Sequence, residues 1–282
     1  MAGEAASARD ERSEFNRFVT GLGRGIAGAL FLALPMLMTM EMWYLGFYMA
    51  RERLLLLLLL NIPLLVLLAH RIGFEETFTW REAVRDAIIA YGIGILASLV
   101  VLSALGLLKG GMPASELVGK VALQSVPASI GAMLGRSQLG HDDEKDHDDA
   151  KETRYPAELL MMGAGALFLS LNIAPTDEMM VLAYKMTIWH AMVVTVISIA
   201  LMHGFVYAVS FIGGHELSPE TPWWHAFVRF TLPGYVIALS ISVFTLWVFE
   251  RLGDSSAVEI MLSVIVLGFP ASLGAAAARL IL

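Results

Sequence analysis

Two glutamates, Glu41 and Glu178, occupy equivalent positions in two similar stretches of this chain, and they are the residues best placed to do chemistry. Residues 27–42 read AGALFLALPMLMTMEM and residues 164–179 read AGALFLSLNIAPTDEM, so that 10 of 16 positions are identical. Apolar segments resemble one another by composition alone. A threonine, a glutamate and a methionine kept in register after the apolar run are harder to obtain by chance. The pattern predicts a duplicated domain with a paired carboxylate.

Carboxylates inside or at the edge of an apolar segment are costly, at about 2–3 kcal/mol near a membrane centre, and they usually face protein or water. Carboxylate and carbonyl oxygens suit hard cations such as Ca²⁺ or Mg²⁺. We therefore predict an ion pathway with these polar residues: Glu41, Glu178, Asp177, Thr39, Thr176 and Asn172. The metal itself stays open. The alternative is that each glutamate ends its helix among lipid headgroups or pairs with a base such as Arg51 or Lys185.

Helix-breaking residues lie next to both glutamates. Pro35 precedes the first, and the segment 172–175, which reads NIAP, precedes the second. A proline inside a helix removes one backbone hydrogen bond. Broken helices that line a cavity often mark ion sites, because they free backbone carbonyls at depth. The alternative is an ordinary kink that serves helix packing.

The composition is that of a membrane protein. Of 282 residues, 57% are hydrophobic and 16% charged, whereas soluble domains are nearer 45–50% apolar and 25% charged. The apolar residues form long continuous runs, which predicts a helical bundle and not a barrel. A net charge of −7 argues against nucleic-acid binding. The chain has no cysteine and no HExxH, GxSxG or P-loop motif, so we expect no enzyme activity and no cofactor.

Eight apolar runs predict an all-α, polytopic transmembrane bundle of about eight spans. The predicted spans are residues 24–48, 53–70, 86–108, 116–135, 157–176, 186–212, 228–250 and 257–282. They group into a cytoplasmic N-terminal tail over 1–21, a first transmembrane repeat over 22–136, an acidic cytoplasmic linker over 137–155 and a second repeat over 156–282. Residues 177–184 are predicted to form a short turn. The linker could bind divalent metal loosely, but a solvated connector is favoured because it lacks the EF-hand spacing.

The similarity continues beyond the opening motif. Residues 80–108 align with 224–252, and residues 116–132 align with 259–275 with a shared Pro-Ala-Ser-x-Gly-Ala. Small residues of this kind let helices approach closely, so we interpret that motif as a packing surface. Because four spans per repeat is an even number, both repeats would enter the membrane from the same side. We therefore predict two parallel four-helix repeats related by an axis along the membrane normal.

The basic residues predict the orientation. With the N-terminus inside, inner segments carry 13 of the 19 Lys and Arg residues and outer segments carry 6. By the positive-inside rule both termini and the acidic linker are cytoplasmic. Arg24 and Glu41 are separated by about 26 Å of helix, close to the roughly 30 Å hydrocarbon thickness. Glu41 is thus predicted near the outer edge of the core.

At GRGIAGAL…PMLMTMEMW, NIAPTDEM and FPASLGA the chain resembles an uncharacterised bacterial family of integral membrane proteins whose function is unknown. The likeness covers both repeats, roughly 20–136 and 155–282. It implies a helical membrane protein, which in a bacterium would lie in the cytoplasmic (inner) membrane, and it carries over no site residue.

We therefore expect an integral membrane channel or transporter for cations, with the lipid bilayer as surroundings and inorganic cations as ligands. A homodimer would bring four glutamates together. One alternative is a scaffold or regulatory subunit that transports nothing and binds an unknown partner. A further alternative is a carrier of lipid or a small hydrophobic molecule, which requires a lateral opening.

Overall fold

The computed structural model describes residues 2–72, 79–139, 155–212, 223–253 and 255–281. Within these residues every regular element is helical, and eight helices are long and apolar enough to cross a membrane. The predicted polytopic bundle is therefore confirmed. Most of the acidic linker and part of the polar stretch before Trp80 lie outside the described residues.

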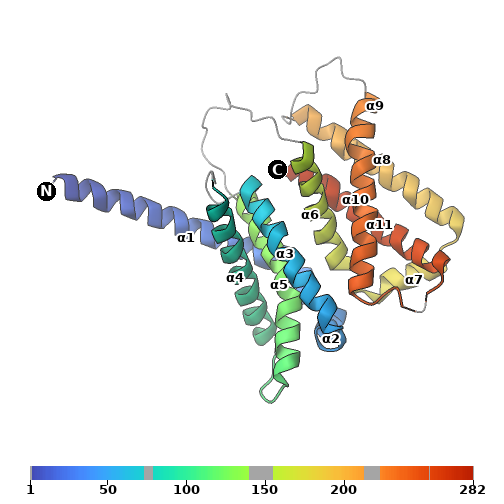
Figure 1. Cartoon of the computed structure of the whole chain (residues 1–282), viewed down its shortest axis with the longest axis horizontal. Helices are drawn as coiled ribbons and strands as arrows, with labels where there is room; N and C mark the ends of the chain where they lie inside the picture. The colour runs from blue at the N-terminus through green and yellow to red at the C-terminus, as the bar shows by residue number, and fades with distance from the viewer. Residues whose placement is uncertain (1, 73–78, 140–154, 213–222, 254, 282) are drawn as a thin grey trace.

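In the first half the described residues form the helices α1 (Ala2–Leu37), α2 (Met40–Tyr48), α3 (Arg51–Ile72), α4 (Trp80–Ala104) and α5 (Ala114–Leu139). The second half contains α6 (Tyr155–Ile173), α7 (Asp177–Lys185), α8 (Ile188–Ile212), the short α9 (Trp223–Ala226), the π-helical turn η1 (Phe227–Thr231), α10 (Leu232–Val248) and α11 (Ala257–Ile281). The two halves stand side by side, and α1 extends well beyond the bundle at its N-terminal end (Figure 1).

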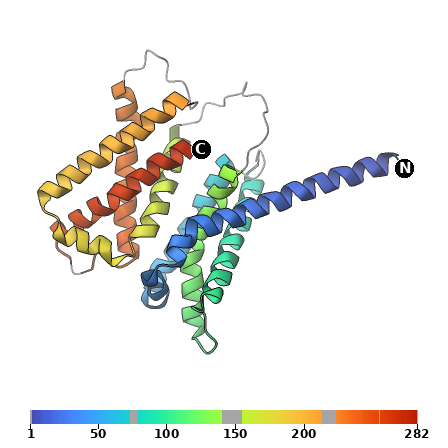
Figure 2. The same ribbon diagram turned by 180° about the vertical axis from the view of Figure 1, so that it is seen from behind.

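Helix boundaries recur between the halves in the same order, at offsets of 137 to 144 residues. α2 and α7 are both nine residues long and start 137 residues apart, as do α3 and α8. The span Trp80–Ala104 has its counterpart at Trp224–Val248, and α5 has its counterpart in α11. In the view from behind, α1 lies in front of α5, whereas α11 lies in front of α6 (Figure 2). That the halves are duplicated repeats stays a prediction, and equivalent positions are compared below as pairs.

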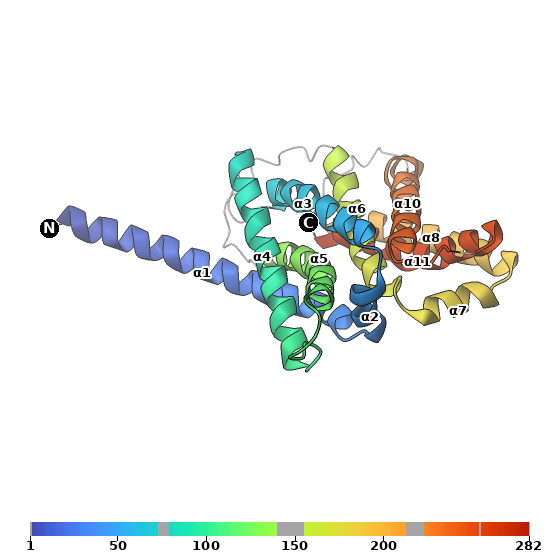
Figure 3. The same cartoon turned by 60° about the horizontal axis from the view of Figure 1, so that its bottom comes forward.

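The opening motif does not fold as one long span. The first predicted span, 24–48, is wrong at its end, because α1 stops at Leu37 and a separate α2 carries Glu41. The predicted turn over 177–184 is also wrong, since these residues form α7. Thr39 and Thr176 both adopt extended backbone conformations immediately before these short helices. Figure 3 shows α2 and α7 at the same end of the bundle.

Aromatic side chains mark both ends of the bundle. Trp80 and Trp224 are more than half exposed where α4 and α9 begin, and Tyr44, Tyr184 and Trp189 are more than half exposed at the opposite end, around α2 and α7. Aromatic residues gather at the two headgroup levels of a bilayer. The helices between these two levels therefore define the membrane-spanning layer.

Glycines set the tightest helix crossings. A Cβ atom on Gly28 would lie 2.5 Å from the Gly131 carbonyl oxygen and 2.6 Å from Cα of Gly135, so α1 and α5 touch backbone to backbone. In the second half Gly165 of α6 meets Gly274 of α11 in the same way. Gly131 and Gly274 belong to the Pro-Ala-Ser-x-Gly-Ala motif, in keeping with its interpretation as a packing surface.

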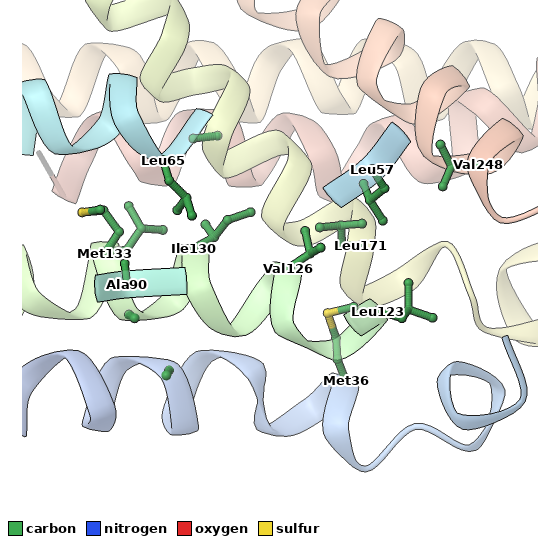
Figure 4. Packing of buried hydrophobic residues seen from close by; sticks show 14 of the residues in the cluster. Met36, Leu57, Leu65, Ala90, Leu123, Val126, Ile130, Met133, Leu171 and Val248 are labelled. Atoms are coloured by element: carbon green, nitrogen blue, oxygen red, sulfur yellow. The ribbon is translucent and has the colours of Figure 1, made fainter. Parts of the chain in front are cut away.

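One apolar core joins the halves. Leu57, Leu123 and Val126 of the first half pack in the same cluster as Leu171 and Val248 of the second half (Figure 4). α5 is the most enclosed span, because 78% of its apolar window is buried. The bundle is thus organised around α5, which contacts α1, α2, α3, α4 and α6.

Candidate functional site

The structure places the two predicted glutamates in the first turns of α2 and α7, where a negative charge stabilises the helix N-terminus. Glu41 is half-buried and Glu178 is exposed. Among the described residues neither forms an ion pair, either with Arg51 or Lys185 or with another base. The neighbouring Asp177 does form one, with Arg251 at 2.9 Å.

The backbone breaks beside the glutamates are closed by side chains. In the first half the Thr39 hydroxyl donates to the Pro35 carbonyl at 2.6 Å, and the Trp43 indole N–H donates to the Leu37 carbonyl at 2.8 Å. Between these two, the Met36 carbonyl accepts from Gln124 at 3.3 Å. The carbonyls of Pro35, Met36 and Leu37, at the end of α1, are therefore already hydrogen-bonded.

The second break is closed by a different set of residues. Thr176 donates its hydroxyl proton to the Ile173 carbonyl at 2.8 Å, and the Asn172 amide donates to the Phe168 carbonyl at 2.7 Å. Arg251 donates to the Pro175 carbonyl in addition to its ion pair with Asp177. The Asn172 amide oxygen is buried and has no hydrogen-bond partner in the described part of the chain.

Charged groups from both halves meet around Tyr48, at the end of α2. Burial raises the pKa of the Tyr48 hydroxyl, Arg251 opposes that shift, and the acidic groups Asp177, Glu250 and Glu41 add to it. Glu41 and Asp177, which belong to different halves, therefore both lie near Tyr48. Arg251 supplies a cation to this group from within the protein.

Glu250 ties the two halves together at the same end. Its carboxylate accepts a hydrogen bond from the Ala50 backbone N–H at 3.0 Å, immediately before α3 begins. Glu250 has a positive φ of 61°, where the equivalent residue of the first half is Gly106 with φ 70°. A non-glycine residue in this region costs about 1–2 kcal/mol. The contact with Ala50 accompanies this strained backbone.

Arg53 makes the third contact across this end. It donates to the Trp247 carbonyl, and its guanidinium lies 4.8 Å from the centre of the Trp247 ring. Together with the Asp177–Arg251 pair, these contacts bring the start of α3, the end of α10 and the start of α7 to one place. The sequence analysis missed Arg251 and Glu250, because their partners lie 74 and 200 residues away.

A second feature, which the sequence analysis also missed, is an apolar cavity between the halves. Its volume is about 720 Å³, within the roughly 300–1,000 Å³ of ordinary ligand pockets. All the residues that line it are apolar or glycine, and they come from α1, α5, α6 and α11. They include Gly28, Phe31, Leu34, Gly135, Phe168 and Ala278.

The cavity is built from equivalent positions of both halves and opens to the side. Phe31 and Phe168 are matched residues of the AGALFL motif, and both line it. Phe31 is 82% exposed, so the wall that it forms faces the surroundings of the protein. The AGALFL motif of both halves therefore forms part of the apolar lining of the cavity.

The described residues form no ready-made metal site. Across the residues that the structure describes, no three histidine, aspartate or glutamate side chains gather closely enough to hold a metal ion. Histidine and carboxylate are the strongest side-chain ligands that a cysteine-free chain can offer a metal ion. Of the predicted ion-pathway residues, Glu41 is half-buried, Glu178 is exposed and Asp177 is paired with Arg251.

Comparison with known proteins gives one match. Residues 21–282 match the family described as "Putative integral membrane protein (DUF2391)". The chain belongs to this family. No curated protein and no solved structure matches it significantly. The family carries no assigned function, so membership establishes an integral membrane protein and leaves its activity to be argued from the structure.

Proposed function

We propose that this protein carries a lipid or another small hydrophobic molecule, which enters the cavity between the two halves sideways from the bilayer. The observation that supports this is the cavity itself: about 720 Å³, lined without a polar side chain and open at Phe31. Among the functions considered for the sequence, a hydrophobe carrier is the one that requires a lateral opening.

The chemistry of the lining favours an apolar ligand over an ion. Moving an unpaired charge into a low-dielectric, apolar space is very unfavourable, and buried charges require partners. Phe31, Leu34 and Phe168 offer none. Apolar cavities of this kind instead take up hydrophobic molecules.

The proposal includes how the protein sits in the bilayer. The two halves are taken as parallel repeats related by an axis along the membrane normal, in a bacterial inner membrane with both termini cytoplasmic. The supporting observations are the shared order of helix boundaries in the two halves and the uneven distribution of Lys and Arg. The cavity then lies on this axis, where the halves meet.

Filling the cavity should remove ligand binding. With a lipid that carries a photoactivatable group in its acyl chain, we expect efficient cross-linking to the wild-type protein. Ala27→Trp should lower the yield at least fivefold, because Ala27 lines the cavity and an indole would occupy it. The matched control is Ile26→Trp, one residue away, since Ile26 is exposed and does not line the cavity. Equal yields from the two variants would refute the proposal.

Cation transport is the second candidate, favoured by the gathering of Glu41, Asp177 and Glu250 around Tyr48. In liposomes, cation flux through the wild-type protein should then exceed that of empty vesicles, and Glu41→Gln with Glu178→Gln should reduce it several-fold. Undiminished flux in the double variant would refute the assignment of these glutamates.

A protein that neither moves cations nor binds lipid, but that co-purifies with one partner, would favour the scaffold alternative.

A further inference from the structure

Arg24 lies one helical turn beyond one end of the cavity. On α1 the lining residues are Ala27, Gly28, Phe31 and Leu34, which recur at helical spacing along one face. Arg24 lies three and four residues before the first two, so it lies on the same face, one turn closer to the N-terminus.

Arg24 is available for a ligand. It is half-buried, and among the described residues it forms no ion pair or hydrogen bond with any carboxylate. A guanidinium at the edge of an apolar layer is stabilised by an anion, and it binds phosphate through two parallel hydrogen bonds. The cavity therefore combines an apolar body with a cationic rim.

The distance from Arg24 to the far end of the cavity matches one leaflet of a bilayer. From Arg24 to Leu34 is ten residues, or about 15 Å of helix. The hydrocarbon core is about 30 Å thick, so one leaflet provides acyl chains of about 15 Å. A lipid whose headgroup lies at Arg24 would thus reach the deep end of the cavity with its acyl chain.

We propose that the molecule in this cavity is an anionic phospholipid of the leaflet on the Arg24 side, with one acyl chain along Ala27–Leu34 and its headgroup phosphate at Arg24. This rests on the proposed function and names its ligand class. A neutral hydrophobe would leave Arg24 without an anion. A second copy of the chain in the cavity would have to bring an acidic side chain to the same place.

Native mass spectrometry can test this with the full chain released from nanodiscs that contain phosphatidylglycerol and phosphatidylcholine with identical acyl chains. We expect one retained lipid per chain, with phosphatidylglycerol preferred about fivefold or more, the factor that one additional charge contact near a membrane surface provides. Arg24→Gln should abolish the preference and Arg24→Lys should keep most of it. Arg81→Gln, which removes an exposed arginine at the same end of the bundle, should leave it unchanged.

The outcomes separate the two proposals. Retained lipid without a preference in the wild type, or an unchanged preference in Arg24→Gln, would overturn the anionic ligand and leave the hydrophobe carrier standing. Three other results would overturn both proposals. They are a protein that retains no lipid, a lipid that Ala27→Trp does not displace, and a dimer that binds no lipid. If Arg24→Gln fails to fold, Arg24→Lys still tests the proposal. This variant keeps the positive charge and must still prefer phosphatidylglycerol.

Discussion

Gly28→Ala should destabilise this protein by about 1–3 kcal/mol, although alanine is the better helix former. A methyl group at position 28 would meet the Gly131 carbonyl and Cα of Gly135 at 2.5 and 2.6 Å, and both are backbone atoms that cannot rotate away. α1 and α5 would have to separate, which would disturb the contact around which the first half is built. In a thermal melt in detergent, the midpoint should fall by about 2–10 °C.

The control for this substitution is Gly92→Ala in α4. No atom outside the local helix lies within 4 Å of a Cβ placed on Gly92. The exchange should therefore be neutral or stabilise by about 0.5–1 kcal/mol, because glycine costs that much more than alanine in a helix. Equal melting temperatures for the two variants would mean that the α1–α5 crossing is looser than described.

Lys120→Met should cost about 3–5 kcal/mol, the usual penalty for leaving one charge of a buried pair without its partner. The Lys120 ammonium lies 2.7 Å from the Glu116 carboxylate on the same helix, and the two side chains are only 10% and 19% exposed. Glu116 would remain in this place without a counter-charge. The free energy of unfolding, or the melting midpoint in detergent, measures the loss.

The double variant Glu116→Gln/Lys120→Met separates charge from packing. It removes both charges and keeps the backbone contact between Lys120 Cα and Gly46, which any residue at position 120 would make. Its stability should return close to that of the wild type. A double variant as unstable as Lys120→Met would show that the lysine chain stabilises by packing and not by its charge.

The number of spans follows from the sequence because the membrane imposes it. Each apolar run is near the length that a helix needs to cross the hydrocarbon layer, and the bilayer allows few alternatives. The ends of the spans depend on finer effects. Pro35 signals a break, yet α1 continues to Leu37, because proline removes only its own N–H bond and the end of the helix is stabilised by Thr39, Trp43 and Gln124.

Comparison of the two copies could have corrected one error. Residues 40–48 were predicted inside a span and the equivalent residues 177–184 as a turn, although aligned segments of a duplicated chain should share one structure. Both form nine-residue helices.

The cavity could not be predicted, since it depends on how closely two pairs of helices cross and on the space that this leaves between the halves. The Asp177–Arg251 pair joins residues 74 apart and has no local signal.

The central claim is that a lipid chain occupies the cavity between the halves, and the position of the cross-link made by a photoactivatable acyl chain tests it most directly. Peptide mass spectrometry of the cross-linked wild-type protein should locate the adducts on the lining segments of α1 and α6, around Phe31 and Phe168. Ala27→Trp should remove these adducts, and Ile26→Trp should keep them. Adducts spread evenly over the exposed apolar surface, such as Leu96 and Val236, with none at the lining residues, would contradict the account.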